Sequence, residues 1–333
     1  MNDIFRRRTG ARGRQTRARV ARAALIATVL ASSALANHGP GTSGGGSSTI
    51  SGETLHEGLW DFSLRTDFTN YRSKTRAEAA AIGAVVGDFD SLDHSLVETL
   101  SAAYGVSDDV QLSASFGYYM GTNFTSAESD GAGGATVSDA DPEGLTDLWL
   151  DAKFRLMHGA SGNLALVAGV KLPTGRDDVK LSDGTPLEPS SQPGSGAVDG
   201  QLGLGYSCYL TSRWTIDASA LYTLRGSHDG FTVGDRCDAG LALAWRATED
   251  VKSFPNLSFS AEVLGVWVGK DESGGVKNEN SGGTSVFLAP GVRERFNENV
   301  SLALSIGLPL SQNLNGEQVE TDWKAALTLG FAF

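Results

Sequence analysis

The last thirteen residues of the sequence limit its possible folds most. Residues 321–333 read T-D-W-K-A-A-L-T-L-G-F-A-F. From residue 323 on, the odd positions carry Trp, Ala, Leu or Phe, and the even positions carry charged, small or polar residues. A repeat of two residues describes a β-strand and not a helix. One apolar face with an aromatic residue at each end is typical of a membrane β-barrel, in which about ten residues cross the bilayer.

The same alternation recurs along the chain from residue 58 onward. We expect twelve strands, at about residues 58–71, 94–107, 109–121, 144–157, 163–173, 196–210, 213–224, 233–247, 256–270, 284–296, 299–310 and 321–333. The connections between them alternate between long and short, and outer-membrane barrels have long outer loops and short periplasmic turns. The sequence therefore predicts an all-β fold: a closed, transmembrane, antiparallel up-and-down β-barrel.

Outward-facing aromatic residues gather near both expected ends of the strands. Near the periplasmic ends lie Trp60, Tyr104, Phe154, Tyr206, Trp214, Trp245, Phe296 and Phe331, and near the outer ends lie Phe68, Phe116, Tyr118, Tyr222, Trp267 and Trp323. Such girdles mark the two membrane–water interfaces of a barrel. In a soluble sandwich, the aromatic residues would instead gather in the core, at the middle of the strands.

The N-terminus carries an export signal. Residues 1–22 hold eight arginines, a short apolar run follows at 23–31, and Ala34-Leu35-Ala36 supplies a cleavage site. This order is that of a secretory signal peptide, and the run is too short to span a bilayer. Cleavage would remove the eight arginines and Asp3 and would change the formal net charge from -12 to -19. So acidic a chain is not expected to bind nucleic acid.

These features divide the chain into three parts. We predict a signal peptide at residues 1–36, a flexible Gly/Ser-rich periplasmic arm at 37–57 and an outer-membrane β-barrel at 58–333. Segments rich in Gly and Ser behave as flexible coil. The predicted location is the cell outer membrane, because the chain is exported and no later segment is apolar enough for a spanning helix.

Charged residues on these strands are expected to face the lumen, because a Lys or Arg on the lipid side at the midplane costs about 2–4 kcal/mol. The predicted pore-lining residues are Asp61, Arg65, Asp147, Asp151, Lys153, Arg155, Lys171, Asp199, Asp217, Arg236, Asp238, Arg246, Glu262, Arg293, Asp322 and Lys324. They either line a narrow aqueous path or form an ion-pair network that fills the barrel. The many inward Gly and Ser residues favour the narrow path.

The sequence carries no catalytic motif, and we predict no catalytic residue, no bound metal and no cofactor. A hydrolase at the rim of the barrel would need Ser and His on one face of a strand. His94 and Ser95 are adjacent in the sequence, so they point to opposite faces.

Two features of the first long loop stay open. Residues 75–86 are helix-like and would fold into the mouth of the barrel or cap it. Asp88, Asp90 and Asp93 follow this stretch. Clustered loop carboxylates can bind calcium, although a solvated acidic loop is the simpler interpretation.

Two stretches of the barrel resemble a known family. Residues 147–176 contain D-L-W-L-D-A-K-F-R-L, a short turn and L-A-L-V-A-G-V-K-L-P-T-G-R, and residues 200–225 read G-Q-L-G-L-G-Y-S-C-Y-L-T-S-R-W-T-I-D-A-S-A-L-Y-T-L-R. They resemble the outer-membrane transporter family named for the MetA pathway of phenol degradation, and a weaker similarity extends over residues 58–333. The resemblance implies a barrel that moves small compounds, aromatic or hydrophobic ones among them.

We therefore predict an outer-membrane channel for passive uptake or efflux of small molecules through a narrow, charge-lined lumen. The alternatives are a non-conducting structural or adhesion barrel with ligand-binding outer loops and, less favoured, a rim hydrolase. Expected partners are the outer-membrane lipid bilayer, the barrel-insertion machinery and a small-molecule permeant. The resemblance implies that Phe331 and Phe333 act as the assembly signal. The permeant, the oligomeric state and whether residues 37–57 or 72–93 plug the lumen stay open.

Overall fold

The computed structural model describes residues 46–250 and 252–333. Within these residues, no helix is both long and apolar enough to cross a membrane. The predicted signal peptide at residues 1–36 and the first part of the predicted arm, residues 37–45, lie outside the described residues.

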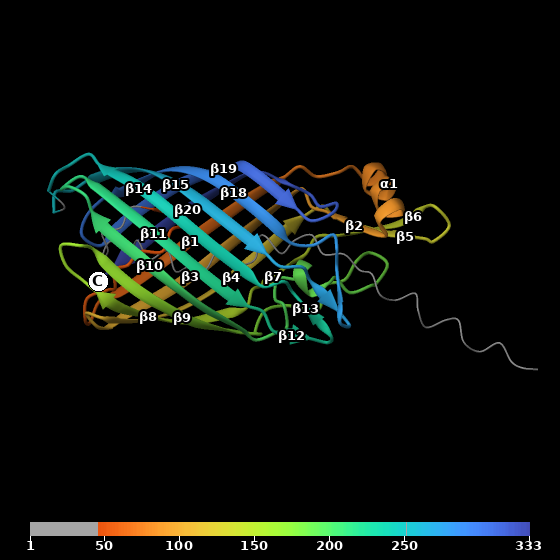
Figure 1. Cartoon of the computed structure of the whole chain (residues 1–333), viewed down its shortest axis with the longest axis horizontal. Coiled ribbons are helices and arrows are strands. Elements are labelled where there is room, and N and C mark those ends of the chain that lie inside the picture. Colours follow the sequence, from red (N-terminus) through yellow and green to blue (C-terminus); the bar gives the residue numbers. More distant parts are fainter. Residues whose placement is uncertain (1–45, 251) are drawn as a thin grey trace, which may run out of the picture.

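Twelve long strands form the wall of a closed barrel (Figure 1). They are β1 (Trp60–Tyr71), β3 (His94–Ser107), β4 (Val110–Thr122), β8 (Leu148–Met157), β9 (Asn163–Leu172), β10 (Asp199–Tyr209), β11 (Trp214–Leu224), β14 (Arg236–Arg246), β15 (Asn256–Val268), β18 (Gly283–Arg295), β19 (Val300–Leu314) and β20 (Thr321–Ala332). Each pairs antiparallel with the next, and β1 pairs with both β3 and β20. The predicted closed twelve-stranded barrel is confirmed.

Closure of the ring satisfies the backbone groups of the first and last strands. The Trp60 N–H donates to the Phe333 carbonyl at 2.8 Å, and the Phe333 N–H donates to the Trp60 carbonyl at 3.0 Å. A bilayer offers no water to unpaired N–H and C=O groups, so only a sheet without edges can cross it. The two strands therefore bury each other's edges along their whole length.

The outward surface of the wall is apolar between two aromatic zones. The rings of Trp60 and Tyr104 are 4.7 Å apart near one end, and those of Phe68 and Trp323 are 5.1 Å apart near the other. Between the zones lie exposed aliphatic side chains such as Leu202, which is 58% exposed. An apolar band of this extent belongs in lipid and not in water.

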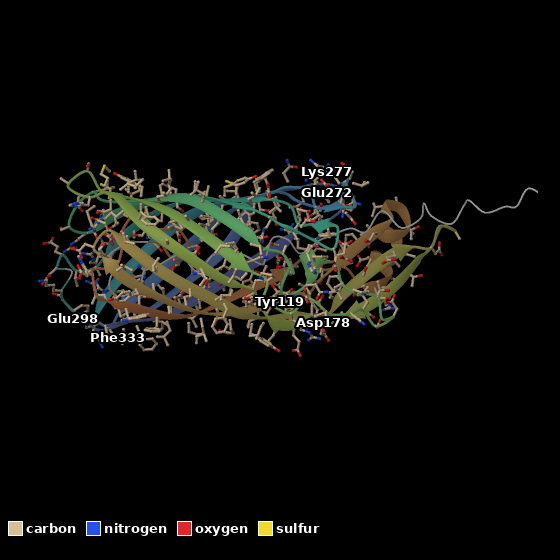
Figure 2. All side chains as sticks on the ribbon, turned by 90° about the horizontal axis from the view of Figure 1, so that it is seen from below. Tyr119, Asp178, Glu272, Lys277, Glu298 and Phe333 are labelled. Carbon is tan, nitrogen blue, oxygen red and sulfur yellow. The ribbon has the colours of Figure 1, made fainter. Side chains whose placement is uncertain are left out.

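The connections differ in length at the two ends (Figure 1). Short turns join the strands at the end that holds the C-terminus, here called the inner end, and long connections join them at the outer end. Figure 2 places Glu298 and Phe333 at the inner end and Asp178, Glu272 and Lys277 at the outer end. Long connections face the cell exterior in outer-membrane barrels.

The long connections carry the remaining elements. These are α1 (Arg76–Val86), β2 (Asp88–Ser91), β5 (Phe124–Ser129), β6 (Ala135–Ala140), β7 (Glu143–Leu145), η1 (Pro189–Ser191), β12 (Ser227–His228), β13 (Phe231–Thr232), β16 (Glu272–Ser273) and β17 (Val276–Lys277). Strand β7 pairs with β4 at the edge of the wall. Strands β12, β13, β16 and β17 form a small sheet of their own.

Helix α1 and strands β2, β5 and β6 form an outer extension that projects beyond the barrel (Figure 1). The helix begins with a capping box, in which the Thr75 hydroxyl accepts from the Glu78 N–H and the Glu78 carboxylate accepts from the Thr75 N–H. Ala79, Phe89 and Phe124 belong to one apolar cluster beneath it. The helix predicted at residues 75–86 is present, and it lies outside the lumen.

The acidic residues after α1 are not a solvated loop. Asp88 and Asp90 are buried on β2, because β2 pairs with β5. Burial and then repulsion from Asp88 raise the pKa of Asp90 well above its ordinary value. Asp93 instead accepts a hydrogen bond from the Asn123 amide at 2.7 Å. Over the described residues, no group of three or more His, Cys, Asp or Glu side chains is arranged to hold a metal ion.

Candidate transport lumen

Most of the predicted pore-lining residues are buried on the inward face of the wall. The buried ones are Asp61, Arg65, Asp147, Asp151, Lys153, Lys171, Asp199, Asp217, Arg236, Arg246, Glu262 and Arg293. Arg155, Asp238 and Lys324 are partly exposed. Burial of a charge is costly unless hydrogen bonds or opposite charges compensate it. The contacts of these side chains therefore show how the lumen is organised.

Asp322 does not lie with the other predicted lining residues. The register between β1 and β20 shifts between Asn70 and Tyr71. The shift makes Asp322 the extra residue of a β-bulge, which interrupts the alternation of faces. Its exposed carboxylate lies 3.3 Å from the Asn70 amide and 3.6 Å from the Arg72 Nε. The lining prediction is wrong for this residue.

Glu98 is a charged wall residue that faces outward. It pairs with Thr66 across β1 and β3, and the Thr66 hydroxyl donates to its carboxylate at 2.8 Å. Both neighbours of Thr66 along β1, Arg65 and Asp67, line a cavity inside the barrel, so Thr66 and Glu98 point the other way. The expectation that charges take the lumen side therefore has an exception here.

A buried ion network ties the outer connections to the wall. Lys171 Nζ lies 2.8 Å from a carboxylate oxygen of Asp147 and 2.8 Å from one of Asp199. Arg225 lies 2.9 Å from Asp199. The Ser195 N–H donates to Asp147 at 3.0 Å, which anchors the connection between β9 and β10. At this end, the charges form the ion-pair network that was one of the two interpretations of the sequence.

Residues 46–55 run inside the barrel from its middle to its inner end. Thr49, Ser51 and Leu55 have no exposed surface. The Leu55 N–H donates to the Gln111 side chain at 3.0 Å near the inner end. The structure places residues 46–55 in the lumen, and the prediction of a flexible periplasmic arm does not hold for them. We call residues 46–55 the luminal arm.

Glu262 on β15 holds the luminal arm at the middle of the barrel. Its carboxylate accepts hydrogen bonds from the N–H groups of Ser47, Ser48 and Thr49 at 2.6, 3.1 and 2.9 Å. It also accepts from the Thr49 hydroxyl at 2.8 Å. Glu262 itself has no exposed surface. A buried carboxylate with several N–H and O–H donors is well compensated.

Two arginines of the wall hold carbonyl groups of the same segment. Arg65 donates to the Ser47 carbonyl at 2.8 Å, and Arg293 donates to the Gly46 carbonyl at 2.7 Å. The wall thus recognises the backbone of the luminal arm through an acceptor for its N–H groups and donors for its carbonyl groups. The arm also makes an apolar contact, in which Ile50 clusters with Val167 and Leu221.

Glycine permits this close approach on both sides. A Cβ at Gly52 would lie 2.1 Å from the Asn163 carbonyl oxygen, and one at Gly205 would lie 2.6 Å from the Ser51 carbonyl oxygen. The small residues that predicted an open middle therefore make room for the luminal arm. The Gly/Ser composition of the arm reflects close packing here and not flexibility.

A cavity of about 110 Å³ lies on the outer side of the luminal arm. The arm contributes Ser48 and Ile50 to its lining. The charged residues of the lining are Arg65, Asp67, Arg236, Asp238 and Lys324, and its apolar side chains include Leu221, Leu264 and Val266. Among the described residues, the luminal arm therefore fills part of the lumen, and this cavity lies beyond it.

Two features of the lumen were not predicted from the sequence. The first is the contact of the luminal arm with Glu262, and the second is an inward aromatic ring, Phe287, which is buried under Lys324. A signal for the first is visible in the sequence. Arg65 and Arg236 each have a carboxylate two positions on, at Asp67 and Asp238, whereas Glu262 has no basic residue two positions away.

His94 and Ser95 lie on opposite faces, as expected. The His94 ring lies 5.6 Å from the outward Phe68 ring. Ser95 has no exposed surface and its hydroxyl lies 3.4 Å from the Tyr71 hydroxyl. These two residues cannot act together on one substrate.

Residues 76–314 match the family described as "Putative MetA-pathway of phenol degradation". The chain belongs to this family. Among solved structures it is similar to the COG4313 outer membrane channel from Pseudomonas putida F1, with a TM-score of 0.60 and 17% identity over 84% of this chain and 97% of that chain. No curated protein matches. The resemblance noted in the sequence is confirmed, and the fold is that of an outer-membrane β-barrel.

Two further solved structures are similar to this family member at lower scores. The KdgM porin has a TM-score of 0.43 and 6% identity, over 82% of this chain and 99% of that chain. The CymD monoaromatic hydrocarbon channel has a TM-score of 0.41 and 13% identity, over 90% of this chain and 98% of that chain.

Proposed function

We propose that this outer-membrane barrel is a channel for the passive passage of small molecules, and that the luminal arm is its gate. The observation that carries the proposal is the way in which the arm is held. Its backbone is bound by side chains of the wall, chiefly Glu262, Arg65 and Arg293. The arm is not a strand of the barrel.

The strength of these contacts suits a gate. A hydrogen bond to a charged group contributes about 1.5–3 kcal/mol net. Four such bonds to Glu262 hold the arm firmly, yet each can be replaced by a bond to water when the arm leaves. A wall strand cannot leave in this way, because lipid offers its backbone no partner.

The lining suits small solutes that carry few charges. Arg65 and Arg236 are each bound by a carboxylate of their own strand, so most fixed charge is neutralised locally. The remaining space near Leu221 and Leu264 is partly apolar. A solute with few charges can pass this lining without losing much bound water and without breaking the ion pairs of Arg65 and Arg236.

Conductance in planar bilayers tests the proposal. We expect a low conductance for the intact chain and a large increase after deletion of residues 37–57, with residues 1–36 kept for export. Liposomes with trapped solute supply a second readout. A folded deletion variant that neither conducts nor passes solute would refute the channel and would favour a non-conducting barrel whose outer extension binds a ligand.

A further inference from the structure

Two of the three basic side chains around the luminal cavity have a carboxylate partner on their own strand. Arg65 donates to both carboxylate oxygens of Asp67 at 2.7 Å. Arg236 donates to both oxygens of Asp238 at 2.7 Å. In each pair the partner lies two positions on, where the strand returns to the same face.

Lys324 lacks such a partner. Asp322 lies two positions before it and would be the equivalent residue, but the β-bulge of β20 carries Asp322 to the surface beside Arg72. Over the described residues, no carboxylate forms an ion pair with Lys324. Its ammonium group lies 3.9 Å from the centroid of the Phe287 ring. A cation over a ring face is stabilised, but less than by an anion.

The wall holds the Lys324 side chain in one direction. Gly307 is its cross-strand neighbour on β19. A Cβ at Gly307 would lie 2.7 Å from the Cγ of Lys324 and 2.9 Å from its Cε. The methylene chain therefore lies flat over Gly307, and Lys324 lines the cavity together with Ser48 and Ile50 of the luminal arm.

The cavity offers complementary surfaces to an anion with an apolar body. Its charged lining consists of three basic residues, Arg65, Arg236 and Lys324, and two acidic residues, Asp67 and Asp238. The lining therefore has one more positive than negative charge. Ile50, Leu221, Leu264 and Val266 supply apolar side chains. The volume of about 110 Å³ is close to that of an engineered cavity of roughly 150 Å³ that accepts benzene.

We propose that this cavity is a binding site for a small carboxylate with an aromatic or branched aliphatic body. The carboxylate pairs with Lys324, and the apolar body lies against the Leu264 side of the cavity. The inference rests on the proposed function, because it treats the lumen as the path of the permeant.

Equilibrium binding to the folded, detergent-solubilised full chain tests the site. The probes are benzoate, neutral benzamide and benzylammonium, which share one ring and differ in charge. We expect saturable binding of benzoate, and binding of the other two weaker by about tenfold or more, as the loss of one charge-assisted bond predicts. Lys324→Met should weaken benzoate binding by the same factor, and Lys324→Arg should keep most of it.

The matched control is Lys277→Met, which removes the same charge from the outer end and should leave benzoate binding unchanged. Equal binding of benzoate and benzamide, or full binding by a folded Lys324→Met variant, would overturn the site. Uptake of the same probes into liposomes separates the two proposals. Lys324-dependent binding without any uptake would refute the channel alone, and equal uptake of all three probes without such binding would refute the site alone.

Discussion

Replacement of Glu262 by glutamine is the most direct perturbation of the luminal arm. The two side chains have nearly the same shape, so the wall should still fold. Glutamine keeps one acceptor oxygen and replaces the other with an NH₂ group, which faces N–H groups of the arm. It also removes the negative charge that strengthens all four hydrogen bonds.

The expected loss follows from those contacts. If the remaining oxygen serves Ser48 and Thr49, the Ser47 N–H, now 2.6 Å from a carboxylate oxygen, is left without an acceptor. An unsatisfied buried donor costs about 1–3 kcal/mol, and each remaining bond falls from about 1.5–3 to about 0.5–1.5 kcal/mol. Docking of the arm should weaken by about 4–7 kcal/mol, which is roughly three to five orders of magnitude in the docking equilibrium.

Single-channel recording measures this change. We expect Glu262→Gln to raise the fraction of time in the open state toward that of the chain without residues 37–57. Thr49→Ala removes the hydroxyl contact with Glu262 and keeps the three backbone N–H contacts, so it should give a smaller increase, of about 1.5–3 kcal/mol or roughly ten- to hundredfold. The control is Glu98→Gln, the same substitution on the outward face, where the carboxylate contacts Thr66 and not the arm.

A specific result would refute this reasoning. If the deletion of residues 37–57 conducts and Glu262→Gln behaves like the intact chain, Glu262 does not hold the gate. If Glu98→Gln opens the channel as much as Glu262→Gln does, the effect comes from a loosened wall and not from the arm.

Three further predictions concern the wall and its two ends. Gly205→Val should also open the channel, because a side chain at 205 would lie 2.6 Å from the Ser51 carbonyl oxygen; normal gating in a folded variant would count against the close packing of the arm. Burial raises the pKa of Asp271, in the outer connection after β15, to about 7. The closed connection therefore holds the proton more tightly than an open one, and its stability should be greatest below about pH 4 and fall as the pH rises to about 7. Limited proteolysis of the outer end should accelerate over that interval, and Asp271→Asn should abolish the pH dependence. Deletion of Phe333 should impair assembly more than conduction, because it removes both hydrogen bonds to Trp60; normal heat-modifiable mobility and normal membrane levels would contradict this.

The wall of the barrel was predictable because its signal is local. Alternation with a period of two specifies both the strand and its lipid face, and β20 shows this with exposed Leu327 beside buried Ala326. The sorting of connections by length then orders the strands. No long-range information is needed, since each strand pairs with the next along the chain.

The luminal arm was not predictable because its partners are distant in sequence. Glu262 lies 213 residues from Thr49, to which it is hydrogen-bonded. Read alone, a Gly/Ser-rich segment has no reason to be ordered. It becomes ordered only when the closed wall places hydrogen-bond acceptors, donors and side-chain-free glycine positions next to the backbone groups of the arm.

The charges of β20 show the same division. The sequence by itself determined that Asp322 and Lys324 alternate with apolar residues, and it therefore predicted that both line the lumen. Only the tertiary structure decided that a bulge opposite Asn70 turns Asp322 to the surface and leaves Lys324 inside without a carboxylate. The physical reason is that face alternation is a property of one strand, whereas a register shift arises from the fit of two strands at the closure of the barrel.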